Sequence, residues 1–307
     1  MHIHLTRSSM HQISVIIPSY NHIEHLKRCV QSILHQKCTS SFEIIIVDSS
    51  PIEIQRLIET MFKDFSNVKL IKLAKQTFPG IARNIGIKEA KGEFIGMIDA
   101  DCTVEEGWLE CILNYVKEDM VICGTIKNGT PLNIWGTAGY LVEFNGFLKS
   151  NQPPVEIKGA STGNFGSKRS LFDKYGYFSG YRAFEDFFFA ENLRKKGGRI
   201  VKYDDFTMTH HNRTNFSHIW KNIRMLGKLS AKVRRENGLP PKLIFRFPML
   251  AFFLTFFRYF SGLKNTLQSK YFYSYILLTP LLIMLYLGWS IGFYEGSKEE
   301  NNVKLYN

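Results

Sequence analysis

Short apolar runs alternate with longer segments of helical periodicity over the first hundred residues of the chain. The runs are rich in β-branched residues and stop at proline, aspartate or glycine, which is typical of buried strands. Between the runs, apolar side chains recur every three or four positions, which predicts helices with one buried face. Strands are expected at residues 13–17, 42–47 and 68–73, and from residue 94 to the aspartates that follow it.

Each of the first three predicted strands is followed by a predicted helix. Asn21 and Glu24 resemble a capping box, so the first helix is expected to begin there. Pro79 and Gly80 begin the third helix, which covers residues 81–90. The buried faces are expected to consist of Leu26, Val30, Ile33 and Leu34 in the first helix and of Ile54, Leu57, Ile58 and Met61 in the second. This alternation predicts an α/β fold with a doubly wound, mostly parallel sheet and right-handed crossovers.

The most informative stretch is Phe94–Cys102, an apolar run that ends in Asp99 and Asp101. Residues two apart on a strand share a face, so the two carboxylates are expected to converge on one target. Carboxylate oxygens suit Mg²⁺ or Mn²⁺, held partly by the protein and partly by a substrate diphosphate. For a motif this short, the alternative is a solvated turn after a strand.

Asp48 also follows a predicted strand. Ligands of open α/β sheets bind at the carboxyl ends of the strands, so Asp48, Asp99 and Asp101 together indicate a nucleotide pocket. An Asx turn that caps the next helix is the alternative interpretation of Asp48. The sequence contains neither the glycine-rich dinucleotide fingerprint nor a P-loop, so neither an NAD enzyme nor an NTPase is indicated.

Composition and charge add a class of partner and a compartment. The 307 residues are 45% hydrophobic and 21% charged, which describes a globular chain, and the net charge is +12. Lysine and arginine are dense from Arg194 to Arg246, which suits nucleic acid, anionic lipid or a phosphorylated substrate. The five cysteines form no C-x-x-C pair, and Met1–His11 lacks the apolar core of a signal peptide. Reduced thiols and a catalytic part in the cytosol are therefore expected.

The chain changes character after Pro240. Phe247–Phe257 is apolar and flanked by arginines, which is typical of an interfacial or re-entrant segment. Tyr271–Tyr294 carries no charge and its length matches a hydrocarbon core of about 30 Å, so we expect it to span a membrane. The alternative is a helix buried inside the protein or in a dimer. We therefore expect a catalytic domain at residues 1–236 and a membrane-associating helical region at residues 237–307.

Several motifs follow one another in a recognisable order. They are Ser14–Asn21, Ile46–Asp48, Ala82–Gly86, Asp99–Asp101, Gly163–Arg169, Gly176–Phe178, Phe184–Asp186 and His210. Together they resemble the GT-A glycosyltransferases of family 2, over roughly Ile13 to Gly227. The resemblance implies a GT-A-like fold with a donor half at about residues 12–125 and an acceptor half at about residues 126–236. It also implies a nucleotide-sugar donor, with UDP as the default base.

The resemblance further implies roles on the donor side. The turn formed by Pro18, Ser19, Tyr20 and Asn21 would cradle the base, and Asp48 would contact the base or ribose. Arg83 would lie near the base or diphosphate, although a solvated position on a helix surface is the alternative.

By the same resemblance, Asp99 would face the ribose or donor sugar. Asp101 would bind the metal, Mn²⁺ or Mg²⁺, with His210 assisting. His211 is the alternative ligand, since a histidine ring at either position suits a metal.

On the acceptor side, the resemblance makes Asp186 the general base. An inverting transfer needs a group that takes the proton from the attacking hydroxyl, and a carboxylate suits that role. Glu185 would orient the helix or touch the acceptor, and Gly163 and Asn164 would lie on the acceptor side. The alternative is that both acids only cap a helix, where acidic residues are common.

The chain departs from the family pattern in a few places. Asn192 stands where an arginine is usual, and Phe188 stands where a polar or acidic residue is common. Ser49 follows Asp48 where a second acid or asparagine is frequent. The Q-x-x-R-W motif of processive synthases is absent, so transfer of one sugar per encounter is expected.

The sequence thus favours an inverting, metal-dependent glycosyltransferase on the cytoplasmic face of the cell membrane. Its expected partners are a nucleotide-sugar donor, a glycan or lipid-linked acceptor and membrane lipid, and no nucleic acid. One alternative is a sugar-phosphate nucleotidyltransferase, which would favour a glycine-rich first loop with a lysine. The other is a non-catalytic, membrane-tethered module that binds nucleotide or nucleic acid, against which the intact acidic motifs argue.

Overall fold

The chain folds into two compact units in a computed structural model that describes residues 12–150 and 153–299. The first unit comprises the described parts of Met1–Thr125, Gln152–Gly180 and Glu185–Met208, and the second those of Ile126–Asn151, Tyr181–Phe184 and Thr209–Asn307. Strands β6 (Met120–Asn128) and β9 (Arg199–His210) each begin in the first unit and end in the second.

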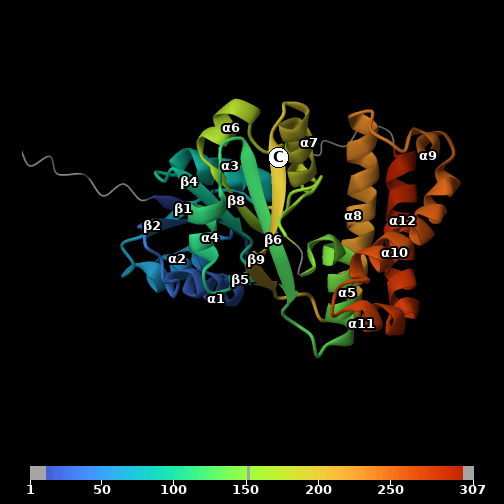
Figure 1. Ribbon diagram of the computed structural model, residues 1–307, viewed down its shortest axis with the longest axis horizontal. Helices are drawn as coiled ribbons and strands as arrows, with labels where there is room; N and C mark the ends of the chain where they lie inside the picture. Colours follow the sequence, from blue (N-terminus) through green and yellow to red (C-terminus); the bar gives the residue numbers. More distant parts are fainter. Residues whose placement is uncertain (1–11, 151–152, 300–307) are drawn as a thin grey trace, which may run out of the picture. The chain divides into compact units, whose positions relative to one another are not determined.

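The first unit contains the sheet, apart from the ends of β6 and β9, together with the helices named below (Figure 1). Its other strands are β1 (Ile13–Ser19), β2 (Phe42–Asp48), β3 (Val68–Lys72), β4 (Phe94–Ile98), β5 (Cys102–Val104), β7 (Val155–Glu156) and β8 (Asn164–Lys168). Its helices are α1 (Ile23–Leu34), α2 (Ile52–Phe62), α3 (Pro79–Glu89), α4 (Trp108–Tyr115), α6 (Ser170–Tyr175) and α7 (Glu185–Lys195).

Four strands form a parallel half of the sheet in the order β3-β2-β1-β4. Ile13 pairs with Phe42 on one side and with Phe94 on the other. β1, β2 and β4 are almost entirely buried, which explains why they are continuous apolar runs and not alternating ones. The four strand predictions for this half are confirmed to within one or two residues.

The remaining strands make the sheet a mixed one. β8 is antiparallel to β4, and β6 is antiparallel to β8, so the order is β3-β2-β1-β4-β8-β6-β9-β5 among the described residues, with β7 beside β9. The prediction of a mostly parallel sheet therefore holds for the first half only. Because Ile98 pairs with Asn164, the residues that follow β4 lie beside the residues that precede β8.

The predicted capping box at Asn21 and Glu24 is wrong. α1 begins after His22, and no side chain of the described residues caps it. Asn21 has a positive φ of 57°, and its backbone N–H donates to Ser50 Oγ at 2.8 Å. Asparagine tolerates this left-handed conformation, so the turn after β1 is fixed by the neighbouring turn and not by the helix.

The face of α2 that meets the core also differs from the prediction. Gln55, Ile58 and Phe62 are buried, whereas Leu57 is exposed. Gln55 Nε2 donates to the carbonyls of Asp48 and Leu73, at 3.1 and 2.9 Å. The buried Gln55 amide, with two backbone partners, replaces one of the expected apolar contacts. A pattern based on hydrophobic residues could not predict this, because glutamine counts as polar.

An aromatic cluster fixes α7 against the sheet. Phe165 of β8, Phe172 of α6 and Phe189 of α7 pack with Phe178, and the rings of Phe178 and Phe189 lie 4.8 Å apart. Asn192 also donates from its amide to the carbonyl of Tyr175. The helix that begins with Glu185 is thus anchored by ring packing and by one amide, in the place where an arginine is usual in the resembling family.

The second unit is helical. Its helices are α5 (Ile134–Phe144), the 3₁₀ turns η1 (Asn145–Phe147) and η2 (Pro248–Phe252), α8 (Phe216–Glu236), α9 (Lys242–Arg246), α10 (Phe253–Thr266), α11 (Phe272–Leu277) and α12 (Thr279–Lys298).

α12 packs along α8 with the two helices running in the same direction. Trp220, Arg224 and Lys228 of α8 face Gly288, Gly292 and Gly296 of α12 in that order. A Cβ on Gly292 would lie 1.9 Å from the Arg224 carbonyl oxygen, and one on Gly296 would lie 2.3 Å from that of Lys228. Glycine at every fourth position therefore brings the two backbones into contact.

The predicted membrane span at Tyr271–Tyr294 is wrong. The stretch is divided between α11 and α12, and none of the described helices combines the length and apolar character that a membrane crossing needs. The apolar side chains of α12 are used within the unit, since Leu282, Leu285 and Phe293 are buried. Arg224 pairs with Glu295, and Lys228 and Lys232 pair with Glu299, which closes the carboxyl end of the α8–α12 pair. The alternative of a helix packed inside the protein describes α12.

Candidate active site

The site starts from the way in which α3 meets the start of α7. Pro79 occupies the first turn of α3, where its fixed φ and missing N–H cost nothing. Gly80 follows, and a Cβ there would lie 2.6 Å from the Ser179 carbonyl oxygen and 3.0 Å from Glu185 Cγ. Only glycine allows this approach, which brings the next turn of α3 close to Glu185.

Arg83 lies on that turn and bridges two carboxylates. Its Nη1 donates to Glu185 Oε1 at 2.7 Å, and its Nη2 donates to Asp99 Oδ1 at 2.5 Å. The Arg83 side chain is 2% exposed, against 9% for Glu185 and 38% for Asp99. The alternative of a solvated helix-surface arginine is therefore wrong, because the guanidinium is an internal link between α3, the end of β4 and the start of α7.

Burial and charge shift the pKa values of this cluster in a consistent way. Burial lowers the pKa of Arg83, but the charges of Asp99 and Glu185 outweigh that effect and its pKa is raised. Burial raises the pKa of Glu185 despite the opposing charge of Arg83. Burial first, and the charge of Glu185 second, raise the pKa of Asp186 to about 7. Three carboxyl groups around one guanidinium leave an excess of negative charge, and a proton on Asp186 relieves it.

Asp186 is half-buried in the first turn of α7. Its Oδ1 accepts a hydrogen bond from the backbone N–H of Phe187 at 2.7 Å. This contact satisfies one donor of the helix start, as the capping alternative expects. A carboxyl with a pKa near neutrality is also suited to take and release a proton at pH 7, so the geometry is compatible with both interpretations.

Asp99 and Asp101 lie in a turn and not on a strand. β4 ends at Ile98, and the backbone N–H of Cys102 donates to the Asp99 carbonyl at 3.0 Å, which closes the turn. The prediction that strand alternation places the two carboxylates on one face is therefore wrong. Each aspartate nevertheless lies beside a buried thiol, since Cys29 Sγ donates to the Asp99 carbonyl oxygen and Cys102 Sγ donates to Asp101 Oδ1, both at 3.6 Å. Burial, and then the charges of Asp101 and Asp99, raise the pKa of both thiols well above its usual value. Asp101 is half-buried, and its carboxylate remains the predicted metal ligand.

Gly163 gives the Asp99 carboxylate its place. A Cβ on Gly163 would lie 2.9 Å from Asp99 Oδ2 and 3.6 Å from Met208 Cε. The absence of a side chain at position 163 thus leaves room for Asp99 beside Arg83. Its predicted position on the acceptor side stays a prediction.

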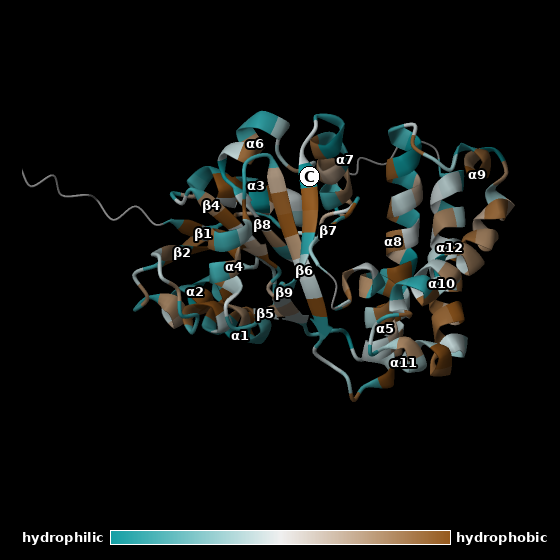
Figure 2. Ribbon diagram, viewed as in Figure 1, coloured by the Kyte–Doolittle hydropathy of each residue, from teal (hydrophilic) through white to brown (hydrophobic). Residues whose placement is uncertain are grey.

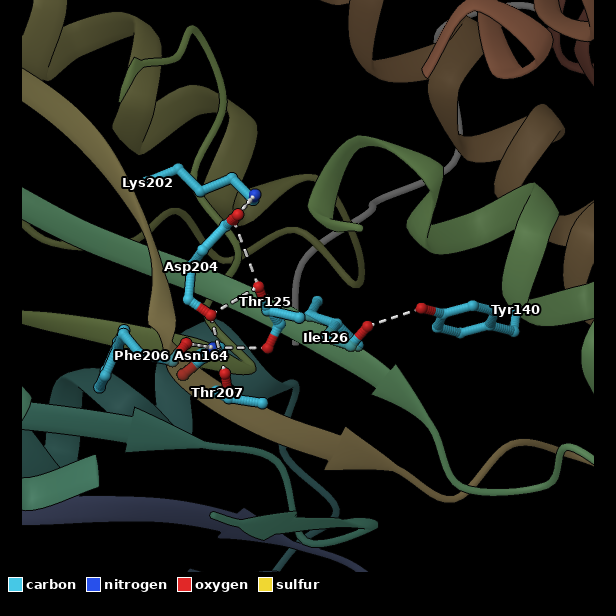
Figure 3. A network of polar contacts seen from close by, with 8 residues as sticks. All are labelled: Thr125, Ile126, Tyr140, Asn164, Lys202, Asp204, Phe206 and Thr207. Carbon is cyan, nitrogen blue, oxygen red and sulfur yellow. Dashed lines mark hydrogen bonds and ion pairs between the residues drawn. The ribbon is translucent and has the colours of Figure 1, made fainter. Parts of the chain in front are cut away.

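Asn164 is fully buried and its side-chain amide is used inside the sheet (Figure 3). Its Oδ1 accepts from Trp108 Nε1 at 2.8 Å, and its Nδ2 donates to the carbonyls of Phe206 and Thr125 at 2.8 and 3.2 Å. Asn164 therefore holds β6 and β9 together beneath the loop that contains Gly163. The sequence motif located this residue but did not reveal its structural use.

A second network in Figure 3 braces the same two strands. Thr125 and Thr207 both donate to the carbonyl of Asp204, at 2.9 and 3.0 Å, and the carboxylate of Asp204 pairs with the buried Lys202. The sheet beneath Asn164 is thus held by side chains from both strands, which gives the neighbouring loop a rigid support.

The predicted base-binding turn is tied to Asp48 by a residue that the sequence did not single out. Asp48 is fully buried, and its carboxylate accepts from the Ser50 N–H and from Ser50 Oγ, both at 2.9 Å. The Ser50 hydroxyl in turn accepts from the backbone N–H of Asn21. Asp48 thus forms an Asx turn, but it does not cap the next helix as the alternative expected, because α2 begins after Pro51 and no side chain in the described part of the chain caps it. The signal for Ser50 was the Asp-Ser-Ser-Pro turn itself. Tyr20 is 37% exposed beside these buried groups.

In the second unit, His210 has the orienting contacts that metal-ligating histidines usually have. Its Nδ1 lies 2.8 Å from Asn212 Oδ1. The Asn212 amide nitrogen donates to Asn128 Oδ1 and Thr130 Oγ1, so its oxygen faces the ring and Nδ1 is the donor. A neutral His210 then has its lone pair on Nε2, the form that binds a metal. The choice between His210 and His211 stays a prediction.

Sequence comparison assigns the family of the chain. The profile described as "Glycosyl transferase family 2" matches residues 14–176, just over half of the sequence. The chain belongs to glycosyl transferase family 2. The match includes Asp48, Arg83, Asp99 and Asp101, whereas the acids of α7 lie beyond it.

Curated relatives of this family 2 chain are similar over part of their length. Glycosyltransferase AglE of Haloferax volcanii is 30% identical over 105 residues, which are 34% of each chain. The poly(ribitol-phosphate) beta-N-acetylglucosaminyltransferase TarP of Staphylococcus aureus strain N315 is 32% identical over 112 residues, 36% of this chain and 34% of TarP. The chain thus matches about a third of the length of these relatives.

Solved structures show the same fold at low sequence identity. Residues 1–349 of S. aureus TarS in complex with UDP-GlcNAc match with a TM-score of 0.53 at 17% identity, over 94% of this chain and 90% of that one. GalNAc-T7 with UDP, GalNAc and Mn²⁺ matches with a TM-score of 0.55 at 17% identity, over 76% and 52%. The GT-A-like fold implied by the sequence motifs is confirmed for this family 2 chain.

We expect the Arg83→Met variant to be strongly destabilised. It removes the cation between Glu185 and Asp99 and leaves Glu185 buried without its partner, which costs about 3 kcal/mol of the free energy of unfolding. Urea denaturation followed by circular dichroism measures this loss. Lys69→Met is the matched control, since it removes an ion pair of similar length, to Glu89, that is exposed and should leave the midpoint unchanged. Equal midpoints for the two variants would contradict the internal role of Arg83.

Proposed function

We propose that this family 2 chain is an inverting, metal-dependent glycosyltransferase that moves a sugar from a UDP-sugar to a saccharide or lipid-linked acceptor. The observation that carries the proposal is the carboxyl of Asp186, with a pKa of about 7, beside a buried Arg83–Glu185 pair. The names of the relatives support the class of reaction, since TarP is a beta-N-acetylglucosaminyltransferase and TarS was crystallised with UDP-GlcNAc.

In the proposed mechanism Asp186 removes the proton from the acceptor hydroxyl. A base works best when its pKa lies near the operating pH, because it is then ionised often enough and still basic enough. Burial and the charge of Glu185 bring Asp186 to that value. Glu185 is not available as a second base, because Arg83 holds its carboxylate. Its proposed role is to set the position and charge of the helix start.

Asp101 fits the proposed metal role by the chemistry of its surroundings. Its carboxylate supplies hard oxygen atoms, whereas the neighbouring thiol of Cys102 is held protonated by burial and by the aspartate charges. His210, with its lone pair on Nε2, is the assisting ligand that the family resemblance implies. A bound Mn²⁺ or Mg²⁺ ion would neutralise charge on the leaving diphosphate.

The remaining predicted residues make up the proposed donor site. Asp48 and the turn from Pro18 to Asn21 form one hydrogen-bonded group through Ser50, which would receive the base and ribose. Asp99 is held by Arg83 and would face the donor sugar. A thermal-shift panel of UDP-, GDP- and dTDP-sugars, each with and without Mn²⁺, tests donor and metal together, because ligands of the native state raise its stability. No shift with any UDP-sugar would contradict the UDP assignment.

The proposed location is the cytoplasmic face of the cell membrane. It rests on the basic stretch from Arg194 to Arg246 and on the aromatic residues that follow it in the chain. Among the other functions that the sequence left open, a sugar-phosphate nucleotidyltransferase is disfavoured by the family match.

We expect Asp186→Asn to bind donor normally and to lose at least about 10²-fold in transfer, the low end of general-base contributions. In the unchanged protein the rate should rise with pH and reach half its plateau near pH 7, because the base must be ionised. Glu191→Gln, on the same helix, is the control and should behave like the unchanged protein. Transfer rates and donor affinity are measured from pH 5 to 9. If Asp186→Asn loses donor binding as strongly as it loses transfer, Asp186 is a structural or donor-side residue and not the base.

Asp101→Asn should abolish donor binding that depends on Mn²⁺ while leaving the fold intact. The amide keeps the size of the side chain and removes the charge that a hard cation needs. Titration calorimetry of Mn²⁺ and UDP, together with a thermal melt, measures both effects. Asp64→Asn, at an exposed carboxylate of the same unit, is the control. Unchanged metal-dependent binding in Asp101→Asn would remove this residue from the site.

Gly163→Ala should reduce transfer by about 10²-fold. The added methyl group would displace the Asp99 carboxylate, and a displacement of about 1 Å at a positioned group can lower the rate by that factor. The new methyl group would meet Asp99 Oδ2 at 2.9 Å and push the carboxylate away from Arg83. Gly159→Ala is the control, since a Cβ there meets no heavy atom of the described residues within 4 Å. Gly163→Ala should unfold at a lower temperature than Gly159→Ala, because it weakens the Arg83–Asp99 pair, but it should remain folded because the Arg83–Glu185 pair is kept. Equal transfer rates would show that Asp99 needs no exact position.

A further inference from the structure

The helix α10 turns a stripe of phenylalanines toward solvent. Phe253, Phe256, Phe257 and Phe260 follow the i, i+3, i+4, i+7 spacing that normally marks the buried face of a helix. Their exposed fractions are 68%, 56%, 72% and 61%. An apolar stripe on a helix normally faces the core, whereas this one faces solvent. Contiguous exposed apolar side chains of this kind mark interaction surfaces.

The opposite side of α10 is locked in place by specific contacts. Thr255 Oγ1 donates to Ser290 Oγ of α12 at 2.9 Å. A Cβ on Gly262 would lie 2.3 Å from the Tyr275 hydroxyl oxygen, so the helix is in close contact with α11 at this point. The Tyr275 hydroxyl also donates to the Tyr259 carbonyl at 2.8 Å. Rotation of α10 to bury its phenylalanines would break these contacts, so their exposure is a property of the packed unit.

Neighbouring exposed residues extend the stripe at both ends. We call the set made by α10 and the segment before it the aromatic face. It consists of Phe247, Met249, Phe253, Phe256, Phe257 and Phe260. After α10, Tyr273 and Leu277 of α11 are also exposed, each by more than 80%. Brown, hydrophobic segments recur along α9 and α10 in Figure 2.

The charged residues of the segment that carries the aromatic face are all basic. The sequence has no aspartate or glutamate between Glu236 and Glu295. The same interval contains Lys242, Arg246, Lys264 and Lys270, and all four are exposed. Phenylalanine with lysine and arginine, and without acids, is the composition of segments that lie in the interface of an anionic bilayer.

We propose that the aromatic face docks on the surface of an anionic lipid bilayer, with its phenylalanines in the interface and the four basic residues at the phosphates. This inference specifies the membrane location in the proposed function and rests on it. A second copy of the chain fits this face less well, because a symmetric contact would bring the lysines and arginines of both copies together with no acid in the segment to pair with them. The docking is interfacial and requires no helix that crosses the bilayer.

The test uses the full chain and sedimentation with sucrose-loaded vesicles. Vesicles of phosphatidylcholine with phosphatidylglycerol should bind the protein more strongly than vesicles of phosphatidylcholine alone. The variant F253S/F257S should reduce the partition coefficient at least about tenfold, since two large apolar side chains leave the interface. The matched control is I52S/L57S on α2, which removes two exposed apolar side chains of the first unit. It should leave the partition coefficient unchanged.

A charge variant separates the electrostatic part. K264Q/K270Q should lose much of the preference for phosphatidylglycerol. Added salt should weaken the binding of the unchanged protein more than that of K264Q/K270Q, because salt screens the attraction that the two lysines supply. Membrane-bound protein should be released by alkaline carbonate, whereas retention would indicate an integral attachment and overturn interfacial docking.

Three further outcomes would overturn the proposal. The unchanged protein could fail to bind either vesicle, or F253S/F257S could bind as well as the unchanged protein with an unaltered circular dichroism spectrum. Light scattering could instead show a dimer that this variant converts to a monomer, which would assign the face to a second copy. Transfer to a soluble acceptor without vesicles is measured in parallel, and F253S/F257S should retain it. If the unchanged protein binds vesicles but shows no transfer to the soluble acceptor, the proposed reaction is contradicted and the docking is not.

Discussion

The candidate site depends on one buried cation. The guanidinium of Arg83 links α3 to the turn after β4 and to the start of α7, which lies about a hundred positions further along the chain. Removing such a group from water is unfavourable, and the two carboxylates at 2.5 and 2.7 Å are what makes it tolerable. The same arrangement has a chemical consequence, because one cation cannot neutralise three carboxyl groups. Burial raises the pKa of Asp186 to about 7, and the excess charge, chiefly that of Glu185, adds to this effect. No hydrogen bond among the described residues joins Asp186 to Arg83.

Small residues make this arrangement possible. Gly80 lets the first turn of α3 touch the start of α7, and Gly163 leaves space for the carboxylate of Asp99. A side chain at either position would move one partner of Arg83 by an amount that matters for a hydrogen bond. Beneath Gly163, the buried amide of Asn164 holds the strands on which the loop rests. The Arg83 cluster is therefore positioned in two ways. The Asn164 amide fixes the strands next to it, and the glycines at positions 80 and 163 leave room for its carboxylates.

The parallel half of the sheet and the candidate acids could be predicted from the sequence, because both are local signals. β1, β2 and β4 are apolar runs with clear ends, and the acids follow strands or begin a helix. The partners could not be predicted in the same way. The resemblance placed Arg83 near the base or diphosphate, and this stays a prediction. Its ion pair with Glu185, 102 positions away, could not be predicted because no local sequence signal connects the two residues. Ser50 was missed because its hydroxyl links two turns that meet only in the folded chain. The strand argument for Asp99 and Asp101 failed because β4 ends at Ile98, before either aspartate.

The C-terminal helices show most clearly why hydropathy alone is insufficient. Tyr271–Tyr294 is charge-free and was expected to span the membrane, whereas Phe247–Phe257 is flanked by arginines and was expected to be an interfacial or re-entrant segment. In the structure α12 is the packed helix, since Gly288, Gly292 and Gly296 allow α8 to approach so closely that little space remains for anything else. α10 has Thr255, Gly262 and Thr266 on its buried side, so the small and polar residues face inward and the phenylalanines are left outside. In α10 the small and polar residues determine which face is buried and the phenylalanines take the remaining positions. In α12 the glycines are buried together with large apolar side chains. The spacing of small residues was visible in the sequence, and it was a better guide to burial here than mean hydropathy.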